Sequence, residues 1–287
     1  SPDRPRPTIL YGYGGFGIPM HPGYSATMLA WVAAGGVYAV ACLRGGGEEG
    51  EEGHRAGMLG SKQNVFDDFH AAADWLVGSG TTTPGQLAIM GGSNGGLLVG
   101  AALTQRPHAY AAVVCSAPLL DMVRYELFGL GSTWAGEYGT AADPEQLGWL
   151  LSYSPYHHVE DQQSYPAGRL SAGEHDTRVE AWHAKKMAAR LQAATRSEHP
   201  VLLRMEAGGH RRPRPRPHGR GRGGTPPVRD SRCPLRPRPA RAGRGVLPPP
   251  GGKHRRPRGR PGGAGAGGGH RRCGREPRRG VQRGAGN

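Results

Sequence analysis

A single serine between two pairs of glycines constrains this chain more than any other feature. Residues 89–100 read IMGGSNGGLLVG, so Ser93 falls between an apolar strand pattern and an apolar helix pattern. A serine in such a bend has a strained backbone and presents its hydroxyl outward, and side chains at Gly91 and Gly95 would collide with the flanking elements. The bend is predicted to hold a nucleophile, although a glycine-rich helix entry alone is equally compatible with an ordinary tight turn.

Strand and helix patterns alternate through the first 210 residues. Short apolar runs predict buried strands, and apolar residues spaced three or four apart predict helices, one of them with Asn64 as its candidate cap. Near-continuous apolar strands that alternate with helices indicate an α/β fold, in which a mostly parallel sheet has helices on both faces. The expected strands are 8–14, 36–43, 86–90, 110–117 and 201–207, and the expected helices are 24–35, 64–77, 96–105 and 180–194.

Charge divides the chain into two parts after residue 210. Residues 211–287 contain 23 of the 37 Lys and Arg residues and only 2 of the 22 acidic ones, so their net charge is +21 and that of residues 1–210 is −6. The same 77 residues hold 33 Gly and Pro, five aliphatic side chains and no aromatic one. So little apolar surface cannot offset the entropy of ordering the chain. We expect one globular domain over 1–210, followed by a disordered basic tail.

The basic tail has three interpretations. Its Arg/Pro/Gly/Ala/His composition is typical of GC-rich coding DNA translated in a shifted frame, and this interpretation is favoured. A genuine disordered tail is the second. A polyanion-binding arm is the third, because arginines attract phosphate backbones, but the tail offers no aromatic side chain for a base to stack on.

Several function classes are not indicated. No run of 18 apolar residues and no basic leader with an apolar middle occur, so the chain is expected to be cytoplasmic without a membrane span. Cys42 and Cys115 fall in predicted buried strands and are expected to be core residues. Cys233 and Cys273 lack a second ligand pair at zinc-site spacing, and the glycine-rich segment 44–53 carries four glutamates and no phosphate-loop ending. No metal or cofactor is therefore predicted.

Eight longer segments carry a family resemblance. They read YGYGGFG (11–17), LRGGGEEG (43–50), KQNVFDDF (62–69), GGSNGGLLVGAALTQRP (91–107), DMVRY (121–125), STWAGEYG (132–139), YSPYHHV (153–159) and HDTRV (175–179). In this order, and over about residues 8–210, the sequence resembles the catalytic domain of the prolyl oligopeptidase family. The resemblance implies an α/β-hydrolase fold and cleavage of short peptides after proline by a serine peptidase.

The resemblance also assigns a catalytic triad. Ser93 matches the family nucleophile, which needs a base to take its proton. Asp176 matches the acid that orients this base, and His210 matches the histidine, in the chain order Ser, Asp, His of α/β-hydrolases. The other histidines of the matched segments are interpreted as surface or core residues, namely His157, His158, His175 and His183.

Further residues match the substrate-binding parts of the family. Tyr13 matches the tyrosine whose hydroxyl completes the oxyanion hole, together with the backbone N–H of Asn94. Arg178 matches the arginine that binds a substrate carbonyl, a role suited to its fork of donors. A proline ring is flat and apolar, so aromatic faces suit its pocket. The matching pocket residues are the aromatic Phe16, Trp134 and Tyr138, with Val179 as an aliphatic wall. Core packing is the alternative explanation for Phe16 and Trp134.

The sequence departs from the family pattern at four points. The β-propeller that precedes the domain in the family and restricts entry to short peptides has no counterpart here. Gly53 stands where the family usually has a bulky aromatic residue. Gly168, Arg169 and Ser171 interrupt the apolar run of the strand that should lead to Asp176. After His210 the chain continues RRPRPRP, where the family has a glycine and then a C-terminal helix packed on the sheet.

The expected function is that of a serine peptidase, acting as a monomer on short proline-containing peptides. Two alternatives remain open. The domain could be an esterase or acylaminoacyl-peptidase of the same fold, or a catalytically inactive, truncated or frame-shifted fragment. Nucleic acid is not an expected partner of residues 1–210, because the basic charge lies outside them.

Overall fold

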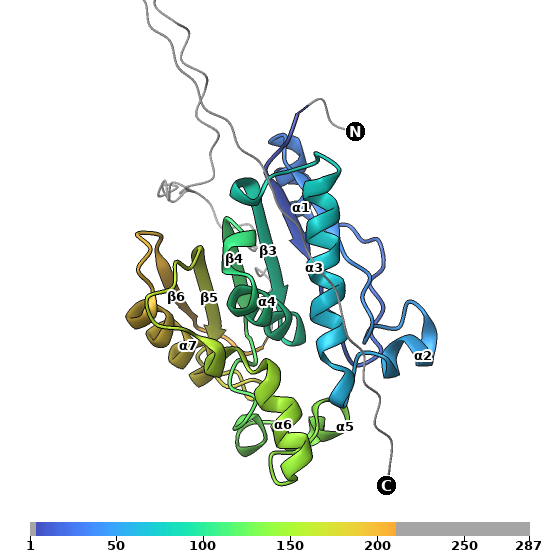
Figure 1. The fold of residues 1–287 in the computed structure, drawn as a ribbon, viewed down its shortest axis with the longest axis vertical. Coiled ribbons are helices and arrows are strands. Elements are labelled where there is room, and N and C mark those ends of the chain that lie inside the picture. Colours follow the sequence, from blue (N-terminus) through green and yellow to red (C-terminus); the bar gives the residue numbers. More distant parts are fainter. Residues whose placement is uncertain (1–3, 211–287) are drawn as a thin grey trace, which may run out of the picture. The chain divides into compact units, whose positions relative to one another are not determined.

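Parallel strands form one six-stranded sheet within residues 4–210, the part of the chain that the computed structural model describes (Figure 1). The predicted tail over 211–287 lies outside these residues. The strand order is β2-β1-β3-β4-β5-β6, and every neighbouring pair is parallel. The strands are β1 (Thr8–Tyr11), β2 (Val37–Val40), β3 (Leu87–Gly92), β4 (Ala112–Ser116), β5 (Ala167–Gly173) and β6 (Val201–Glu206).

The helices follow the strands along the chain, as the alternating pattern predicts. None of those in residues 4–210 has the length and apolar character needed to cross a bilayer. The α-helices are α1 (Ala26–Ala33), α2 (Gly50–Arg55), α3 (Gln63–Gly78), α4 (Asn94–Gln105), α5 (Ala135–Tyr138), α6 (Pro144–Tyr153) and α7 (Trp182–Ala194). Short 3-10 helices lie at Leu59–Ser61, Pro84–Gln86, Pro107–Ala109, Tyr125–Leu127, Gly131–Trp134 and Pro155–His158.

The direction of each crossover decides which face of the sheet its helix covers. The chain runs from β1 outward to the edge strand β2, and then in the opposite direction through β3, β4, β5 and β6. Parallel crossovers are right-handed, so the helix of the outward step and the helices of the later steps lie on opposite faces. Hence α1 covers one face, and α3, α4 and α7 cover the other.

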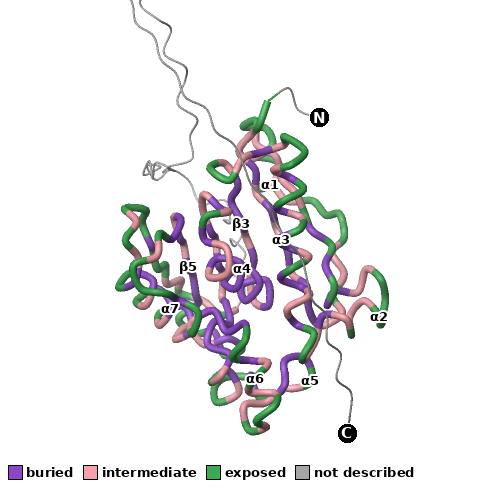
Figure 2. The backbone as a smooth tube through the Cα atoms, viewed as in Figure 1, coloured by how far each residue is buried: buried purple, intermediate pink, exposed green. Residues whose placement is uncertain are grey.

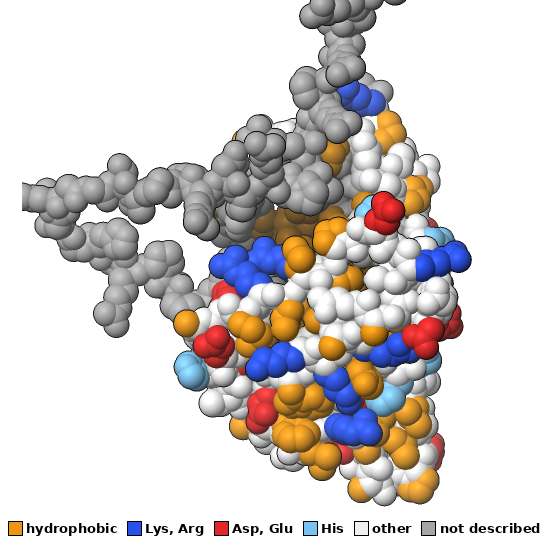
Figure 3. Space-filling view, turned by 90° about the vertical axis from the view of Figure 1, so that its left-hand side faces the viewer, with side chains coloured by type: hydrophobic (Ala, Val, Ile, Leu, Met, Phe, Trp, Pro, Cys, Tyr) orange, Lys and Arg blue, Asp and Glu red, His pale blue; other side chains and the backbone are white. Residues whose placement is uncertain are grey.

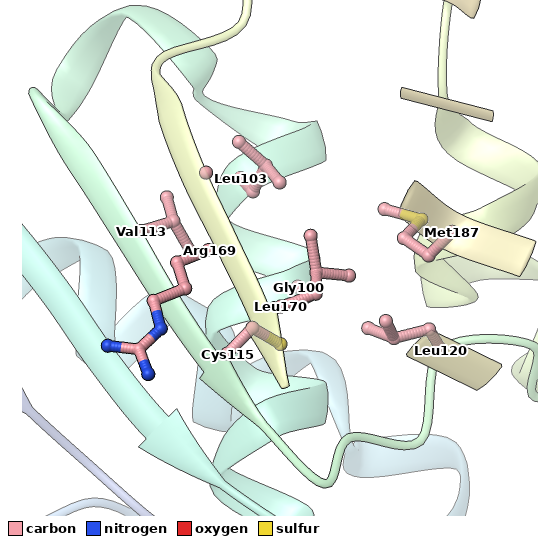
Figure 4. A pocket seen from close by; sticks show the side chains of 9 residues that line it. Gly100, Leu103, Val113, Cys115, Leu120, Arg169, Leu170 and Met187 are labelled. Carbon is pink, nitrogen blue, oxygen red and sulfur yellow. The ribbon is translucent and has the colours of Figure 1, made fainter. Parts of the chain in front are cut away.

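The core lies between the sheet and α3, α4 and α7 (Figure 2). Helix α4 is buried from Asn94 to Leu103, because it packs between β3, β4 and its neighbour α3. A cavity of about 10 Å³ remains between α4, α7 and the strands β4 and β5 (Figure 4). The Arg169 guanidinium points away from Met187 and Leu120 in this cavity. Since it is apolar and barely water-sized, the cavity is a packing defect and not a binding site.

The face of the sheet that α1 covers is only partly buried in the described residues. Helix α1 has no buried residue, and Leu29 and Val32 on it are each about half exposed. Val40 and Leu202 on the edge strands β2 and β6 are also exposed. Seen from the side of β6 and α7, hydrophobic patches alternate with Lys and Arg side chains (Figure 3).

Two local predictions are wrong. Helix α3 begins at Gln63, so Asn64 lies inside it and donates to the Ala56 carbonyl (2.8 Å) instead of capping the helix. Cys42 lies beyond the end of β2 and is exposed, because this strand is shorter than its apolar run; Cys115 is buried as predicted.

Candidate active site

The bend that carries Ser93 joins β3 to α4 at the carboxyl edge of the sheet. Ser93 has φ 58° and ψ −120°, a conformation that a non-glycine residue rarely adopts. Its N–H donates to the Ser116 carbonyl on β4 (2.9 Å), and its carbonyl accepts from the Gly96 N–H (2.8 Å). These bonds on both sides of the residue hold the strained backbone in place.

The predicted requirement for glycine on both sides of Ser93 is confirmed. A Cβ atom at Gly91 would lie 2.0 Å from the Gly95 carbonyl oxygen, and one at Gly95 would lie 2.6 Å from the Gly12 carbonyl oxygen. Both neighbours are backbone atoms, which cannot move aside as a flexible side chain can. The bend therefore exists only because β1, β3 and α4 approach one another without side chains between them.

Replacing Gly91 with alanine should lower the free energy of unfolding by about 1–3 kcal/mol, the usual effect of forcing extra atoms into a packed site. Gly148 is the matched control, because it lies inside helix α6 and a Cβ atom there would point into open space. Gly148→Ala should raise the free energy of unfolding by about 0.5–1 kcal/mol through helix propensity. Urea denaturation measures both values, and a neutral Gly91→Ala would contradict the described geometry.

Asp176 and His210 are hydrogen-bonded to each other beyond the carboxyl ends of β5 and β6. His210 Nδ1 lies 2.8 Å from Asp176 Oδ2. The other carboxylate oxygen, Oδ1, accepts from the N–H groups of Arg178 and Val179, at 3.0 Å each. The Asp176 side chain is fully buried, and 15% of the His210 side chain is exposed. Asp176 is thus held rigidly, while the imidazole reaches the surface.

A small pocket of about 60 Å³, lined by both polar and apolar atoms, adjoins His210. The hydroxyls of Ser116 and Ser171, which lie 3.2 Å apart at the ends of β4 and β5, contribute to its wall. Gly173 leaves room for the His210 loop, since a Cβ there would lie 2.4 Å from the Gly208 carbonyl oxygen. Gly173 at the end of β5 therefore lets the His210 loop approach the strand closely, whereas the predicted interruption at Gly168 has no such role, since a Cβ there would meet only Val201, at 3.9 Å.

Two donors converge beside the Ser93 hydroxyl. The Tyr13 hydroxyl is near enough to the Ser93 side chain and to Arg178 for both to affect the pKa of this tyrosine. Burial raises the pKa of Tyr13, so its hydroxyl remains protonated at neutral pH and can donate. The Asn94 N–H is the first of helix α4, where N–H groups have no acceptor within the helix. Together these donors can stabilise a negatively charged oxygen.

The structure brings together some of the residues assigned to the pocket. The rings of Phe16 and Tyr138 meet edge to face, with centroids 5.6 Å apart. Tyr138 and Val179 are buried, and Trp134 is partly buried against the core at the end of a 3-10 helix, just before helix α5. Arg178 is exposed and lies near enough to Tyr13 to affect its pKa. No contact of Trp134 or Val179 with Phe16 or Tyr13 is found in the described residues.

The remaining histidines fit their interpretation as core or surface residues. His183 is buried, and its Nδ1 accepts from the N–H groups of Leu120 and Asp121 at 3.2 Å each. Burial lowers the pKa of His183 to about 3, so it stays neutral. His158 and His175 are exposed.

The sequence analysis did not single out three ionisable residues that bond to one another near the loop of Tyr13. Lys62 is 1% exposed and bonded to Glu137 (2.8 Å), and the second oxygen of Glu137 bonds to His54 (2.8 Å). Lys62 and Glu137 belong to two of the segments that carry the family resemblance, KQNVFDDF (62–69) and STWAGEYG (132–139). Lys62 falls on the apolar side of an amphipathic helix pattern, and this position could have indicated that its charged side chain is buried.

Comparison with known proteins identifies the family. A model described as the prolyl oligopeptidase family matches residues 22–220, more than half of the chain. The chain belongs to the prolyl oligopeptidase family. Its six-stranded sheet with Ser93 between β3 and α4 is the α/β-hydrolase fold that the resemblance implies.

Members of the prolyl oligopeptidase family with curated names align with most of this domain. A prolyl endopeptidase from Elizabethkingia miricola is 44% identical over 210 residues, which are 72% of this chain and 30% of that protein. A prolyl endopeptidase from Dictyostelium discoideum is 39% identical over 209 residues, 71% of this chain and 28% of that protein. The chain therefore spans less than a third of the length of these relatives.

Solved structures of the prolyl oligopeptidase family superpose on the same region. A prolyl endopeptidase with 58% sequence identity has a TM-score of 0.71 and is matched over 72% of this chain and 31% of its own. Prolyl oligopeptidase B from Galerina marginata, at 36% identity, has a TM-score of 0.70, covering 72% of this chain and 30% of its own.

Proposed function

We propose that this domain is a serine peptidase that cleaves short peptides on the carboxyl side of proline. The observation that carries the proposal is the hydrogen bond between His210 Nδ1 and Asp176. Because a carboxylate can only accept, Nδ1 must be the protonated nitrogen, and Nε2 is left free as a base. A base with this tautomer is what a serine nucleophile needs.

The proposed reaction begins at Ser93. Its Oγ attacks the carbonyl carbon of the proline residue and gives its proton to His210 Nε2. The carbonyl oxygen becomes negatively charged and accepts from the Tyr13 hydroxyl and the Asn94 N–H. When the C–N bond breaks, His210 returns the proton to the leaving amine. Water then hydrolyses the acyl-enzyme. His210 takes a proton from the water as its oxygen attacks the carbonyl carbon, and it returns this proton to Ser93 Oγ when the ester bond breaks.

The preference for proline is supported by the pocket residues. Phe16 and Trp134 are partly exposed and offer aromatic surfaces, on which a ring without an N–H leaves no polar group unsatisfied. Tyr138 is buried and packs edge to face on Phe16, and Val179 is a buried aliphatic side chain next to Arg178 in sequence. Arg178 beside Tyr13 is suited to bind the carbonyl of the preceding residue. The names of the relatives, prolyl endopeptidase and prolyl oligopeptidase, support the same substrate class.

We further propose that the domain acts in the cytoplasm and as a monomer. Cys42 and Cys115 are free thiols, which fits a reducing compartment. All the proposed site residues come from one chain, so the chemistry needs no second copy.

The proposed function is tested by measuring the kcat/KM with which the purified chain hydrolyses three chromogenic compounds. They are an acyl-Gly-Pro anilide, the matching acyl-Gly-Ala anilide and a simple acyl ester. We expect the proline anilide to have the highest kcat/KM. Preference for the ester would instead support an esterase. No turnover, together with failure of a fluorophosphonate probe to label the folded protein, would support a catalytically inactive domain.

A further inference from the structure

Lys62 forms a buried ion pair beneath the loop that carries Tyr13. Its Nζ donates to Glu137 Oε1 (2.8 Å) and to the Gly14 carbonyl (3.1 Å). Lys62 is 1% exposed and Glu137 is 4% exposed. Burial lowers the pKa of Lys62, and the Glu137 carboxylate opposes this shift. Removing two charges from water costs about as much as their attraction returns, so stability alone does not account for the pair.

The second oxygen of Glu137 supports the far end of the same loop. Glu137 Oε2 is bonded to His54 Nε2 (2.8 Å). The His54 ring packs against Gly17, since a Cβ at Gly17 would lie 3.4 Å from His54 Nδ1. One carboxylate therefore supports the loop at two points, through Lys62 under Gly14 and through His54 against Gly17.

The loop needs such support because its backbone is strained. Gly14, Phe16 and Gly17 have φ angles of 63°, 58° and 60°. For Phe16 this conformation costs about 1–2 kcal/mol. The loop also carries the Tyr13 hydroxyl and the Phe16 ring at its two ends, so a change in its backbone would move both.

A second connection joins the same loop to the same helix. The Asn94 side chain donates to the Tyr13 carbonyl (2.6 Å) and accepts from the Tyr138 hydroxyl (2.8 Å). Tyr138 follows Glu137 in helix α5. The carbonyls of Tyr13 and Gly14, two consecutive loop residues, are thus connected to Tyr138 and Glu137, two consecutive helix residues. The Asn94 amide makes the first connection, and the Lys62 ammonium makes the second.

These contacts relate the oxyanion donor to the proline pocket. The Tyr138 ring contacts Phe16, and the Tyr13 hydroxyl is near enough to Ser93 for that side chain to affect the pKa of Tyr13. On the basis of the proposed function, we propose that Lys62, Glu137 and His54 are positioning residues that hold the Tyr13 hydroxyl at the oxyanion and the Phe16 ring, which packs on the buried Tyr138, at the proline ring. They touch neither the substrate nor Ser93.

The test uses a variant in which both charges are removed together. Lys62→Met alone would leave the Glu137 carboxylate buried without its partner and could prevent folding. Lys62→Met/Glu137→Leu replaces the pair with apolar side chains, a change that is often neutral for stability. The control is Arg106→Met/Asp74→Leu, which removes a more exposed ion pair (2.7 Å) remote from the loop.

The binding of two ligands distinguishes an effect on the position of the Tyr13 hydroxyl from an effect on the proline pocket. An acyl-proline aldehyde adds to Ser93 and places an oxygen in the oxyanion site, whereas the corresponding alcohol only fills the pocket. We expect the Lys62/Glu137 double variant to bind the aldehyde about 10- to 100-fold more weakly, as a displacement of about 1 Å would cause, and the alcohol within about threefold. Adding Tyr13→Phe to the double variant should weaken aldehyde binding little further, because both changes remove the same interaction.

Hydrogen exchange gives a readout that does not depend on catalysis. The amides of Gly17 and Ile18 donate to the carbonyls of Gly45 and Gly15, both at 3.1 Å. Their exchange should accelerate at least about 10-fold in the double variant, while exchange in α4 stays unchanged.

The outcomes are distinguishable. Unchanged exchange in the loop, or equal losses of aldehyde and alcohol affinity, would overturn the positioning proposal. A wild-type chain that binds the aldehyde no better than the alcohol would instead contradict the proposed peptidase function, whatever the loop does.

Discussion

Replacing Ser93 with alanine is expected to abolish hydrolysis of the proline anilide, lowering kcat on the order of 10⁶-fold, as the loss of a serine nucleophile does in other peptidases. The bend offers no substitute, because Gly92 and Asn94 on either side have no hydroxyl or thiol. Alanine keeps the Cβ atom and the bonds of the Ser93 backbone to β4 and α4. The fold should therefore remain, and only the chemistry should be lost.

Fluorophosphonate labelling checks this result independently of turnover. Wild-type protein should take up one probe molecule, located at Ser93 by peptide mass spectrometry, and Ser93→Ala should take up none. Ser152→Ala is the control, because Ser152 is exposed on helix α6 and should leave labelling unchanged. Labelling that persists in folded Ser93→Ala would assign the nucleophile to another residue.

Local rules explain why the bend could be predicted from sequence. The glycines at 91 and 95 are required by backbone atoms that lie within a few residues or on a neighbouring strand end, so their pattern is visible in a short segment. The same holds for the parallel sheet, whose buried strands read as apolar runs. The pairing of Asp176 with His210 follows from the family resemblance, and the hydrogen bond between them agrees with that expectation.

Long-range contacts explain what could not be predicted. Lys62 and Glu137 are 75 residues apart, and nothing in either segment specifies the other as its partner. Helices α5 and α6 lie in a stretch that lacks a clear period, because α5 is a single turn and 3-10 helices flank the pair at Gly131–Trp134 and Pro155–His158. The exposure of Cys42 depends on where β2 ends, and strand ends depend on pairing with β1 rather than on the apolar run.

Replacing Asp176 with asparagine is expected to lower kcat by about 10³- to 10⁴-fold without unfolding the domain. The N–H groups of Arg178 and Val179 both donate to Asp176 Oδ1, so the amide oxygen of asparagine must occupy that position. The amide NH₂ then faces His210 Nδ1, which has to accept its hydrogen bond. The imidazole proton is forced onto Nε2, and the ring can no longer take the proton from Ser93.

This argument concerns the tautomer and not the charge alone, and NMR of the His210 ring nitrogens measures it directly. Wild-type protein should carry the proton of the neutral ring on Nδ1, and Asp176→Asn should carry it on Nε2. Asp161→Asn is the control, because Asp161 pairs with Arg190 at the surface and should leave kcat and the tautomer unchanged. If Asp176→Asn retained the wild-type tautomer but still lost activity, the loss would stem from the missing negative charge. If Asp176→Asn retained a kcat within about 10-fold of the wild-type value, Asp176 would not be the residue that orients the base.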